Sequence, residues 1–146
     1  MRDVNHTNRG FTLIELLTVM SIMGIVCSIA LLILGLNPKR AANEASAIAG
    51  IRTLVTAEKV YWVSEGRFVY GDLSELGAEN LIDETLASGH RQGYDFTVGT
   101  DSRGFTITAT PQSTQTGIRS FFADDSGIIR AKVGTGCGPA DPPLGN

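Results

Sequence analysis

The sequence predicts an α+β protein in which a long N-terminal helix packs on a small antiparallel sheet of three or four strands. Three observations carry this prediction. Residues 16–36 contain no charge, the next stretch has apolar side chains at helical spacing, and the C-terminal half contains β-prone runs separated by turns. At 146 residues, 42% of them hydrophobic and 18% charged, the chain has room for one ordinary domain.

The uncharged run from Leu16 to Leu36 is long enough to cross a bilayer. As a helix rising about 1.5 Å per residue, its 21 residues span about 31 Å, the thickness of the hydrocarbon core. The run is longer than the apolar core of a signal peptide, and no small-x-small cleavage site follows it. We therefore expect one retained transmembrane helix, with Cys27 as a small buried residue inside it. Two basic residues on each side leave its orientation open.

A carboxylate lies at the start of this apolar run. An ionised side chain at the centre of a membrane helix costs roughly 2.5 to 3.5 kcal/mol, so such a residue points to a partner supplied by assembly. Alternatively, Glu15 lies near the interface and extends to water. The residues alone leave both interpretations open.

Gly35 and the Asn37-Pro38 pair predict a helix break near the end of the apolar run, because proline lacks the N–H that would bond the preceding turn. We still expect one kinked rod from about Phe11 to about Val63. Its second half has an apolar stripe at spacings of mostly three and four, formed by Ala45, Ile48, Ile51, Leu54, Val55, Tyr61 and Trp62. This stripe is predicted to pack on a globular head.

The head is predicted to begin with a loop from Gly66 to Gly93 that contains two short helical signals. Asp72-Leu-Ser-Glu75 resembles a capping box, and Asp83 can cap residues 84–87. The periodicity then changes to that of strands at 94–98, 105–110, 118–123 and 128–133, with turns at 101–104 and 124–127. Alternation places Tyr94, Phe96 and Val98, or Phe105, Ile107 and Ala109, on the face that covers the helix.

The remaining segments and charges limit the possible functions. Past Ala41 the chain has 8 Lys or Arg against 13 Asp or Glu, a net charge of −5, which argues against binding nucleic acid by charge alone. The Gly/Pro-rich tail from Gly134 shows no pattern, and we expect it to lie on the surface or to be mobile. Its Cys137 is too far from Cys27 to pair within one chain, so it is an unpaired or intermolecularly paired thiol.

The segment GFTLIELL at residues 10–17 resembles the prepilin-type cleavage and methylation signature of type IV pilins and type II secretion pseudopilins. The resemblance implies the pilin fold. It also implies that a membrane-embedded prepilin peptidase cuts between Gly10 and Phe11 and methylates the new amino terminus of Phe11. Glu15 then becomes the fifth residue of the mature subunit. The leader is implied to be cytoplasmic and the head to lie outside the bacterial inner membrane.

The resemblance gives Glu15 a role in filament assembly. Cleavage creates an ammonium on Phe11, and this cation and the Glu15 carboxylate are each costly in lipid while unpaired. A short chain segment holds the two apart in one helix, so we expect pairing between staggered neighbours. The expected divisions of the chain are a cleaved leader at 1–10, a membrane and filament-core helix at 11–36, its amphipathic continuation at 37–63, an α+β head at 64–133 and a tail at 134–146.

Other candidate chemistry is better explained by structure. His90 lies in a Ser-Gly-His-Arg-Gln-Gly stretch that resembles a solvated turn rather than part of a Ser/His/Asp site. No metal or other cofactor is expected, because a hairpin turn explains Asp124, Asp125 and Ser126 without a calcium ion. The aromatic residues Tyr61, Trp62, Phe68 and Tyr70 are predicted to pack in the core under the sheet.

The function implied by the resemblance is that of a structural subunit, not an enzyme. We expect a type IV pilus-like filament of identical subunits, stored in the inner-membrane bilayer and assembled by a membrane platform and its ATPase. One alternative is the major pseudopilin of a type II secretion system, which forms a periplasmic pseudopilus. Another is a pilus-associated protein for DNA uptake or adhesion, although the head is acidic and lacks the C-terminal disulfide loop of adhesive pilins. A membrane-anchored enzyme would require a buried, pKa-shifted group in a pocket.

Overall fold

The computed structural model describes residues 11–33, 38–64 and 68–145, with side chains in the first range described as far as residue 29. The chain divides into two units at residue 37, and each is described by itself. The first contains helix α1 (Leu13–Ile33). No helix within the described ranges is both long and apolar enough for a membrane crossing. The last residues of the predicted span, 34–36, lie outside those ranges.

The second unit begins with helix α2 (Pro38–Val63). From here on the head denotes this whole unit, helix α2 included, and not only the predicted residues 64–133. Pro38 is the first residue of α2. Proline is tolerated there because an N–H group in the first turn would have no hydrogen-bond partner within the helix. The predicted break at Gly35 and the continuity of the rod both fall on residues 34–37, outside the described ranges.

The buried stripe of α2 differs in part from the predicted one. Ile51, Leu54 and Tyr61 are buried as expected, whereas Ala45 is exposed and Trp62 is only half-buried. The observed stripe follows spacings of three and four through Glu44, Ala47, Ile51, Leu54, Glu58 and Tyr61. The prediction for Ala45 is wrong. The stripe instead includes Glu44 and Glu58, whose charged side chains are assigned to solvent when burial is judged from hydropathy.

Two short helices follow α2, and the predicted caps are confirmed. Helix α3 (Leu73–Ala78) begins at Asp72, whose side chain accepts from the Glu75 N–H while the Glu75 side chain accepts from the Asp72 N–H. Helix α4 (Glu84–Ala87) begins at Asp83, whose carboxylate accepts from the N–H of Leu86. The hydrogen bonds that Ser74 and Glu75 donate lower the pKa of Asp72, and those from Thr85 and Leu86 lower that of Asp83.

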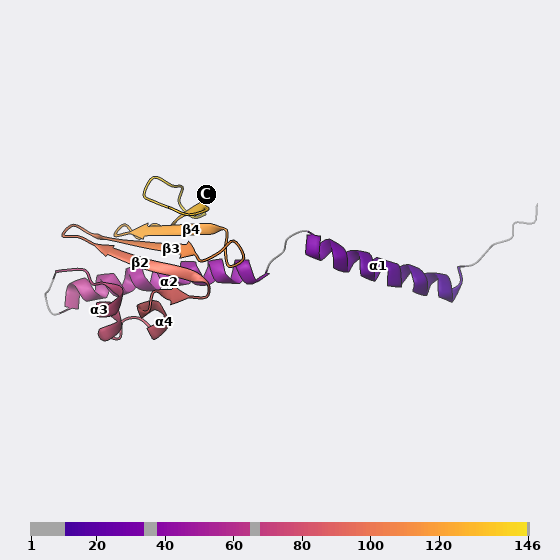
Figure 1. Cartoon of the computed structure of the whole chain (residues 1–146), viewed down its shortest axis with the longest axis horizontal. Helices are drawn as coiled ribbons and strands as arrows, with labels where there is room; N and C mark the ends of the chain where they lie inside the picture. The colour runs from indigo at the N-terminus through magenta and orange to yellow at the C-terminus, as the bar shows by residue number, and fades with distance from the viewer. Residues whose placement is uncertain (1–10, 34–37, 65–67, 146) are drawn as a thin grey trace, which may run out of the picture. The chain divides into compact units, whose positions relative to one another are not determined.

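The sheet has five antiparallel strands in sequence order, one more than the upper prediction. They are β1 (His90–Arg91), β2 (Tyr94–Thr100), β3 (Phe105–Pro111), β4 (Arg119–Asp124) and β5 (Arg130–Val133). The additional strand, β1, has two residues, which is too short for an alternating pattern to be visible in the sequence. Figure 1 shows α2 lying across one face of the sheet.

The core lies between α2 and the sheet. Opposite residues on β2 and β3 include Phe96 with Ala109 and Val98 with Ile107, all on the predicted inner face. Gly50 lets α2 approach this face closely, because a Cβ there would lie 2.9 Å from the Phe96 ring. The predicted pairing of the strand face with the helix stripe is therefore confirmed.

The C-terminal tail lies mostly on the surface as far as residue 145, which is one of the two predicted alternatives, and it contacts the chain around β5. The Ala131 N–H donates to Pro142 O at 3.2 Å, and the Leu144 N–H donates to Ile129 O at 2.7 Å. The Arg130 side chain also donates to Asp141 O at 2.9 Å. The tail thus covers the outer edge of β5, whose backbone groups would otherwise need other partners.

Candidate functional site

The first turn of α1 holds the predicted assembly residue in a capping box. Thr12 precedes the helix, and its N–H and its hydroxyl donate to Glu15 Oε2 at 3.0 and 2.8 Å. In return, the Glu15 N–H donates to Thr12 Oγ1 at 3.3 Å. This is the reciprocal arrangement in which two helix N-terminal donors are satisfied at once. The pattern Thr-x-x-Glu at 12–15 indicates this capping box, and Thr12 is not among the site residues predicted from the sequence.

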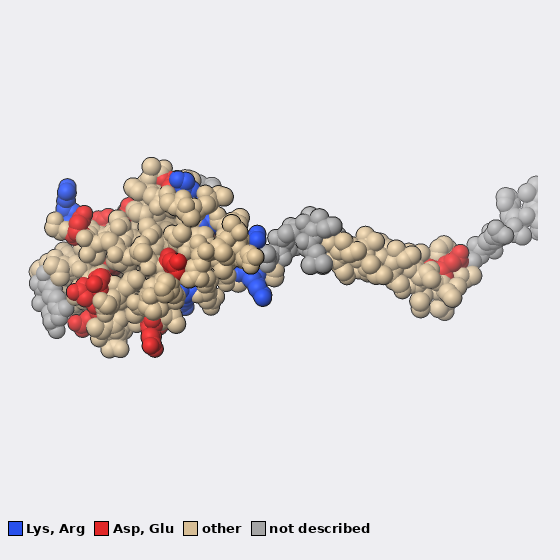
Figure 2. Space-filling model, viewed as in Figure 1, with Lys and Arg blue, Asp and Glu red and all other residues tan. Residues whose placement is uncertain are grey.

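The rest of α1 presents an apolar surface. All described side chains from Phe11 to Ile29 are exposed, among them Leu13 at 82% and Phe11 at 74%. The hydroxyls of Thr18, Ser21 and Ser28 donate to backbone carbonyls three or four residues earlier, at 2.8–2.9 Å. Their donors are therefore satisfied inside the helix, as apolar surroundings require. On the face seen in Figure 2, α1 carries an acidic spot near its start and no basic one.

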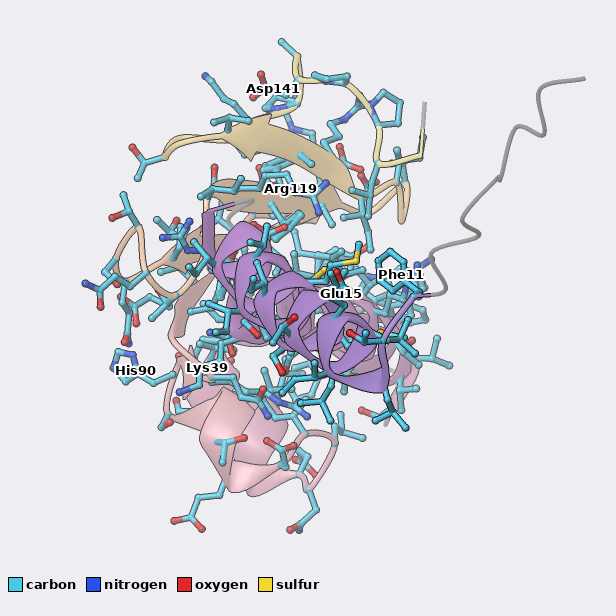
Figure 3. The ribbon with its side chains drawn as sticks, turned by 90° about the vertical axis from the view of Figure 1, so that its right-hand side faces the viewer. Phe11, Glu15, Lys39, His90, Arg119 and Asp141 are labelled. Carbon is cyan, nitrogen blue, oxygen red and sulfur yellow. The ribbon has the colours of Figure 1, made fainter. Side chains whose placement is uncertain are left out.

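Glu15 has hydrogen-bond partners within its own chain, and its pairing with the Phe11 ammonium of a neighbouring subunit stays a prediction. The carboxylate folds back toward the helix start, where Phe11 and Glu15 lie at the same end of α1 (Figure 3). Both bonds from Thr12 go to Oε2, and within the described residues Oε1 receives no hydrogen bond. One oxygen is thus fixed internally while the other remains available for an external cation. Gly10, the predicted cleavage residue, lies outside the described residues.

His90 and its neighbours form an exposed cluster rather than a catalytic site. His90 Nδ1 lies 2.6 Å from Asp95 Oδ1, and Gln112 Nε2 donates to the same oxygen at 2.7 Å. These two contacts, Gln112 first, lower the pKa of Asp95. The His90 side chain is 67% exposed, and no hydroxyl of the described chain is hydrogen-bonded to its ring.

The acidic turn considered for calcium is held by its own side chains. Asp124 Oδ1 accepts from the Ser126 N–H at 3.0 Å and from the Ser126 hydroxyl. Across the described ranges, no three His, Cys, Asp or Glu side chains are placed to hold one metal ion. Asp101 caps the neighbouring turn in the same manner, and the N–H groups of Arg103 and Gly104 lower its pKa.

The aromatic residues at the end of α2 are only partly in the core. Tyr61 is buried, and Tyr70 packs edge-on against Phe105 with ring centroids 5.1 Å apart. Trp62 stacks on Tyr70 at 6.3 Å and contacts Phe68 at 4.9 Å. Phe68 is nevertheless 65% exposed, so the prediction of core packing is wrong for this residue.

Two buried carboxylates on α2 were not anticipated. Glu44 accepts from the Ile118 N–H at 3.1 Å and pairs with the Arg119 guanidinium at 2.7 Å. Glu58 is fully buried and accepts from the Gly71 N–H at 3.0 Å through Oε2, and its Oε1 has no hydrogen-bond partner among the described residues. Burial raises the pKa of Glu58 to about 7. Because this carboxylate is fully buried, a substrate in solution cannot reach it, and it is not evidence for an enzyme.

Comparison with known proteins identifies the N-terminal segment. The prokaryotic N-terminal methylation motif matches residues 5–31, a range that contains Gly10, Phe11 and the Thr12–Glu15 capping box. No curated protein and no solved structure matches the chain. Residues 5–31 therefore carry the signature of type IV pilins and pseudopilins, which marks the chain as a pilin-like or pseudopilin-like precursor with a membrane anchor.

Proposed function

We propose that the chain is a structural subunit of a type IV pilus-like filament. In this proposal it is stored in the inner membrane with its leader in the cytoplasm and its head in the periplasm. Prepilin peptidase cuts between Gly10 and Phe11, and an assembly platform with its ATPase polymerises the mature chain through α1. The observation that carries the proposal is the methylation motif at the start of an exposed, apolar helix with one carboxylate in its first turn.

The apolar surface of α1 needs surroundings that a single soluble chain does not supply. A helix that is hydrophobic all round is stable in lipid or in the interior of an assembly. Both are provided in turn, first by the bilayer and then by α1 helices of neighbouring subunits. Because its hydroxyls are satisfied internally, α1 can pass from one environment to the other without losing those hydrogen bonds.

Glu15 directs this transfer through charge. Cleavage leaves a methylated ammonium on Phe11, and this cation needs a carboxylate in apolar surroundings. The capping box fixes Glu15 Oε2 and leaves Oε1 for the ammonium of an adjacent subunit. Pairing between neighbours then favours polymerisation and sets the axial step between subunits.

Two measurements test the proposal. Intact-mass analysis of protein from native membranes should find a chain that begins at methylated Phe11, and a chain that begins at Met1 would contradict processing. Filament yield should then be compared for Glu15→Gln and Glu15→Ala. Glutamine can retain the capping box without the charge, whereas alanine removes both. We expect both variants to lose filaments, and wild-type yield from Glu15→Gln would refute the charge-pairing step.

The location of the filaments distinguishes a surface type IV pilus from the pseudopilus of a type II secretion system. Electron microscopy of material sheared from cells should show fibres that react with antibodies to the head. Fibres confined to the periplasm would instead identify a pseudopilus of a secretion system. In both cases the filament-subunit role and the Glu15 test apply unchanged.

A further inference from the structure

Acidic side chains gather at one end of the head, where α2 ends. The β2–β3 and β4–β5 turns lie together there, since Asp101, Asp124 and Asp125 line one surface hollow. Arg103 also lines this hollow and Lys59 lies beside Gly127, so the carboxylates outnumber the cations there but are not alone. The Gly71 N–H bonds Glu58 near the end of α2, which brings the first turn of α3, with Asp72 and Glu75, to the same end. We call this region the acidic end; Figure 2 shows Asp and Glu side chains toward the left of the head, with a basic side chain beside them at the upper left.

Basic side chains mark the opposite end, where α2 begins. Lys39 and Arg40 lie in its first turn, and the β3–β4 loop is held beside that turn by the Asn43 amide, which donates to Thr116 O at 3.0 Å. Arg119 is neutralised by Glu44. Lys39 and Arg40, by contrast, have no carboxylate within 4.0 Å among the described residues. Figure 2 shows Lys and Arg at this end, which we call the basic end.

The position of Lys39 and Arg40 is unfavourable for the helix itself. The first turn of a helix carries partial positive charge, so it favours Asp and Glu, and α2 has no acidic residue there. Two cations at this position do not stabilise α2, which points to a partner outside the head. Each end also has exposed apolar side chains, Val63, Phe68 and Val69 at the acidic end and Ile118 and Val133 at the basic end.

We propose that heads of neighbouring subunits associate head to tail, with the basic end of one copy docked on the acidic end of the next. The proposal rests on the proposed filament function and names the contact between its heads. Opposite charges at opposite ends make the contact heterologous, so it can repeat along a fibre without closing on itself. A second copy of this chain fits because the complementary surface is present on the same molecule.

Zero-length cross-linking tests the contact directly. A carbodiimide joins a Lys amine only to a carboxylate in contact with it. Helix α2 has 26 residues and is about 39 Å long, so Lys39 cannot reach the acidic end of its own head. In sheared filaments of mixed light- and heavy-nitrogen subunits, mass spectrometry should find mixed-label peptides joining Lys39 to Asp72, Asp124 or Asp125. Absence of such peptides from intact filaments would overturn the proposal.

Charge reversal provides the second test. We expect Lys39→Glu to lower filament yield about threefold or more, and a second reversal in the same chain, Asp125→Lys, to restore it. Arg52→Glu is the matched control, because it makes the same charge change at an exposed site on α2 and should leave the yield unchanged.

The same variants separate a contact between heads from a contact with anionic lipid. Normal filaments from Lys39→Glu would refute the head contact while leaving the proposed function intact, whereas failure of the wild type to form filaments would refute the proposed function. If Lys39→Glu instead lowered the amount of subunit retained in the membrane, and Asp125→Lys did not restore the filament yield, Lys39 would be assigned to anionic lipid. That result would overturn the head contact.

Discussion

Glu58 predicts a distinctive dependence of stability on pH. Its side chain is fully buried, and in the part of the chain that the structure describes only one of its two oxygens receives a hydrogen bond. Burial is the main cause that raises its pKa from 4.5 to about 7, and the nearby carboxylates of Glu75 and Asp72 add to the shift. The folded chain therefore keeps a proton on Glu58 at pH values where the unfolded chain has released it.

The sign and size of the effect follow from this difference. Between about pH 4.5 and pH 7 the folded state binds more protons, so the free energy of unfolding falls as pH rises. The stabilising contribution is complete below pH 4.5 and is lost as pH passes about 7. At about 1.36 kcal/mol per pKa unit, the full loss is about 3 kcal/mol. Glu58→Gln resembles the protonated side chain and should remove this loss.

The assay is urea unfolding of the full chain in detergent, followed by the fluorescence of Trp62, the one tryptophan in the sequence. At pH 8 we expect Glu58→Gln to be more stable than the wild type by up to about 3 kcal/mol, and at pH 4.5 the two should be nearly equal. Glu84→Gln makes the same change at an exposed site and is the control. Its free energy of unfolding should vary with pH as that of the wild type does. Parallel profiles for Glu58→Gln and the wild type would refute the assignment of this pH dependence to Glu58.

Three further substitutions test other parts of the structure. Thr12→Ala removes the partner of Glu15 and should destabilise the start of α1 by about 1 kcal/mol, seen as faster amide exchange there than in the control Thr18→Ala. Leu54→Ala opens a cavity in the core and should lower the free energy of urea unfolding by about 2–5 kcal/mol. Gly117→Ala would place a Cβ 2.1 Å from the Tyr94 hydroxyl, so the same assay should show a loss of about 1–3 kcal/mol.

Features with short-range causes could be predicted from the sequence. The caps at Asp72 and Asp83 depend on partners three residues away, and both were predicted. The inner face of β2 and β3 follows from alternation within each strand. At the candidate site, Gly10, Phe11 and Glu15 were identified from the motif, although their roles in cleavage and assembly stay predictions.

Features that depend on distant partners could not be predicted. Glu44 is buried because Arg119, 75 residues later, neutralises it. Glu58 receives its hydrogen bond from a loop that packs back on α2. The position of the tail likewise depends on Ile129 and Ala131, whose backbone groups bond Leu144 and Pro142. Hydropathy and local propensity contain no information on such contacts.

The cover over β5 limits how heads can meet when they are crowded together. An open strand edge would let one sheet continue into that of a neighbour, as happens in aggregation. Residues 142–144 occupy one edge beside Ile129 and Ala131, and on the opposite side the two-residue β1 pairs with Tyr94 and Asp95 at the start of β2. The length of open strand edge is thus reduced on both sides of the sheet. The shorter open edges lower the chance that crowded heads join into one continuous sheet.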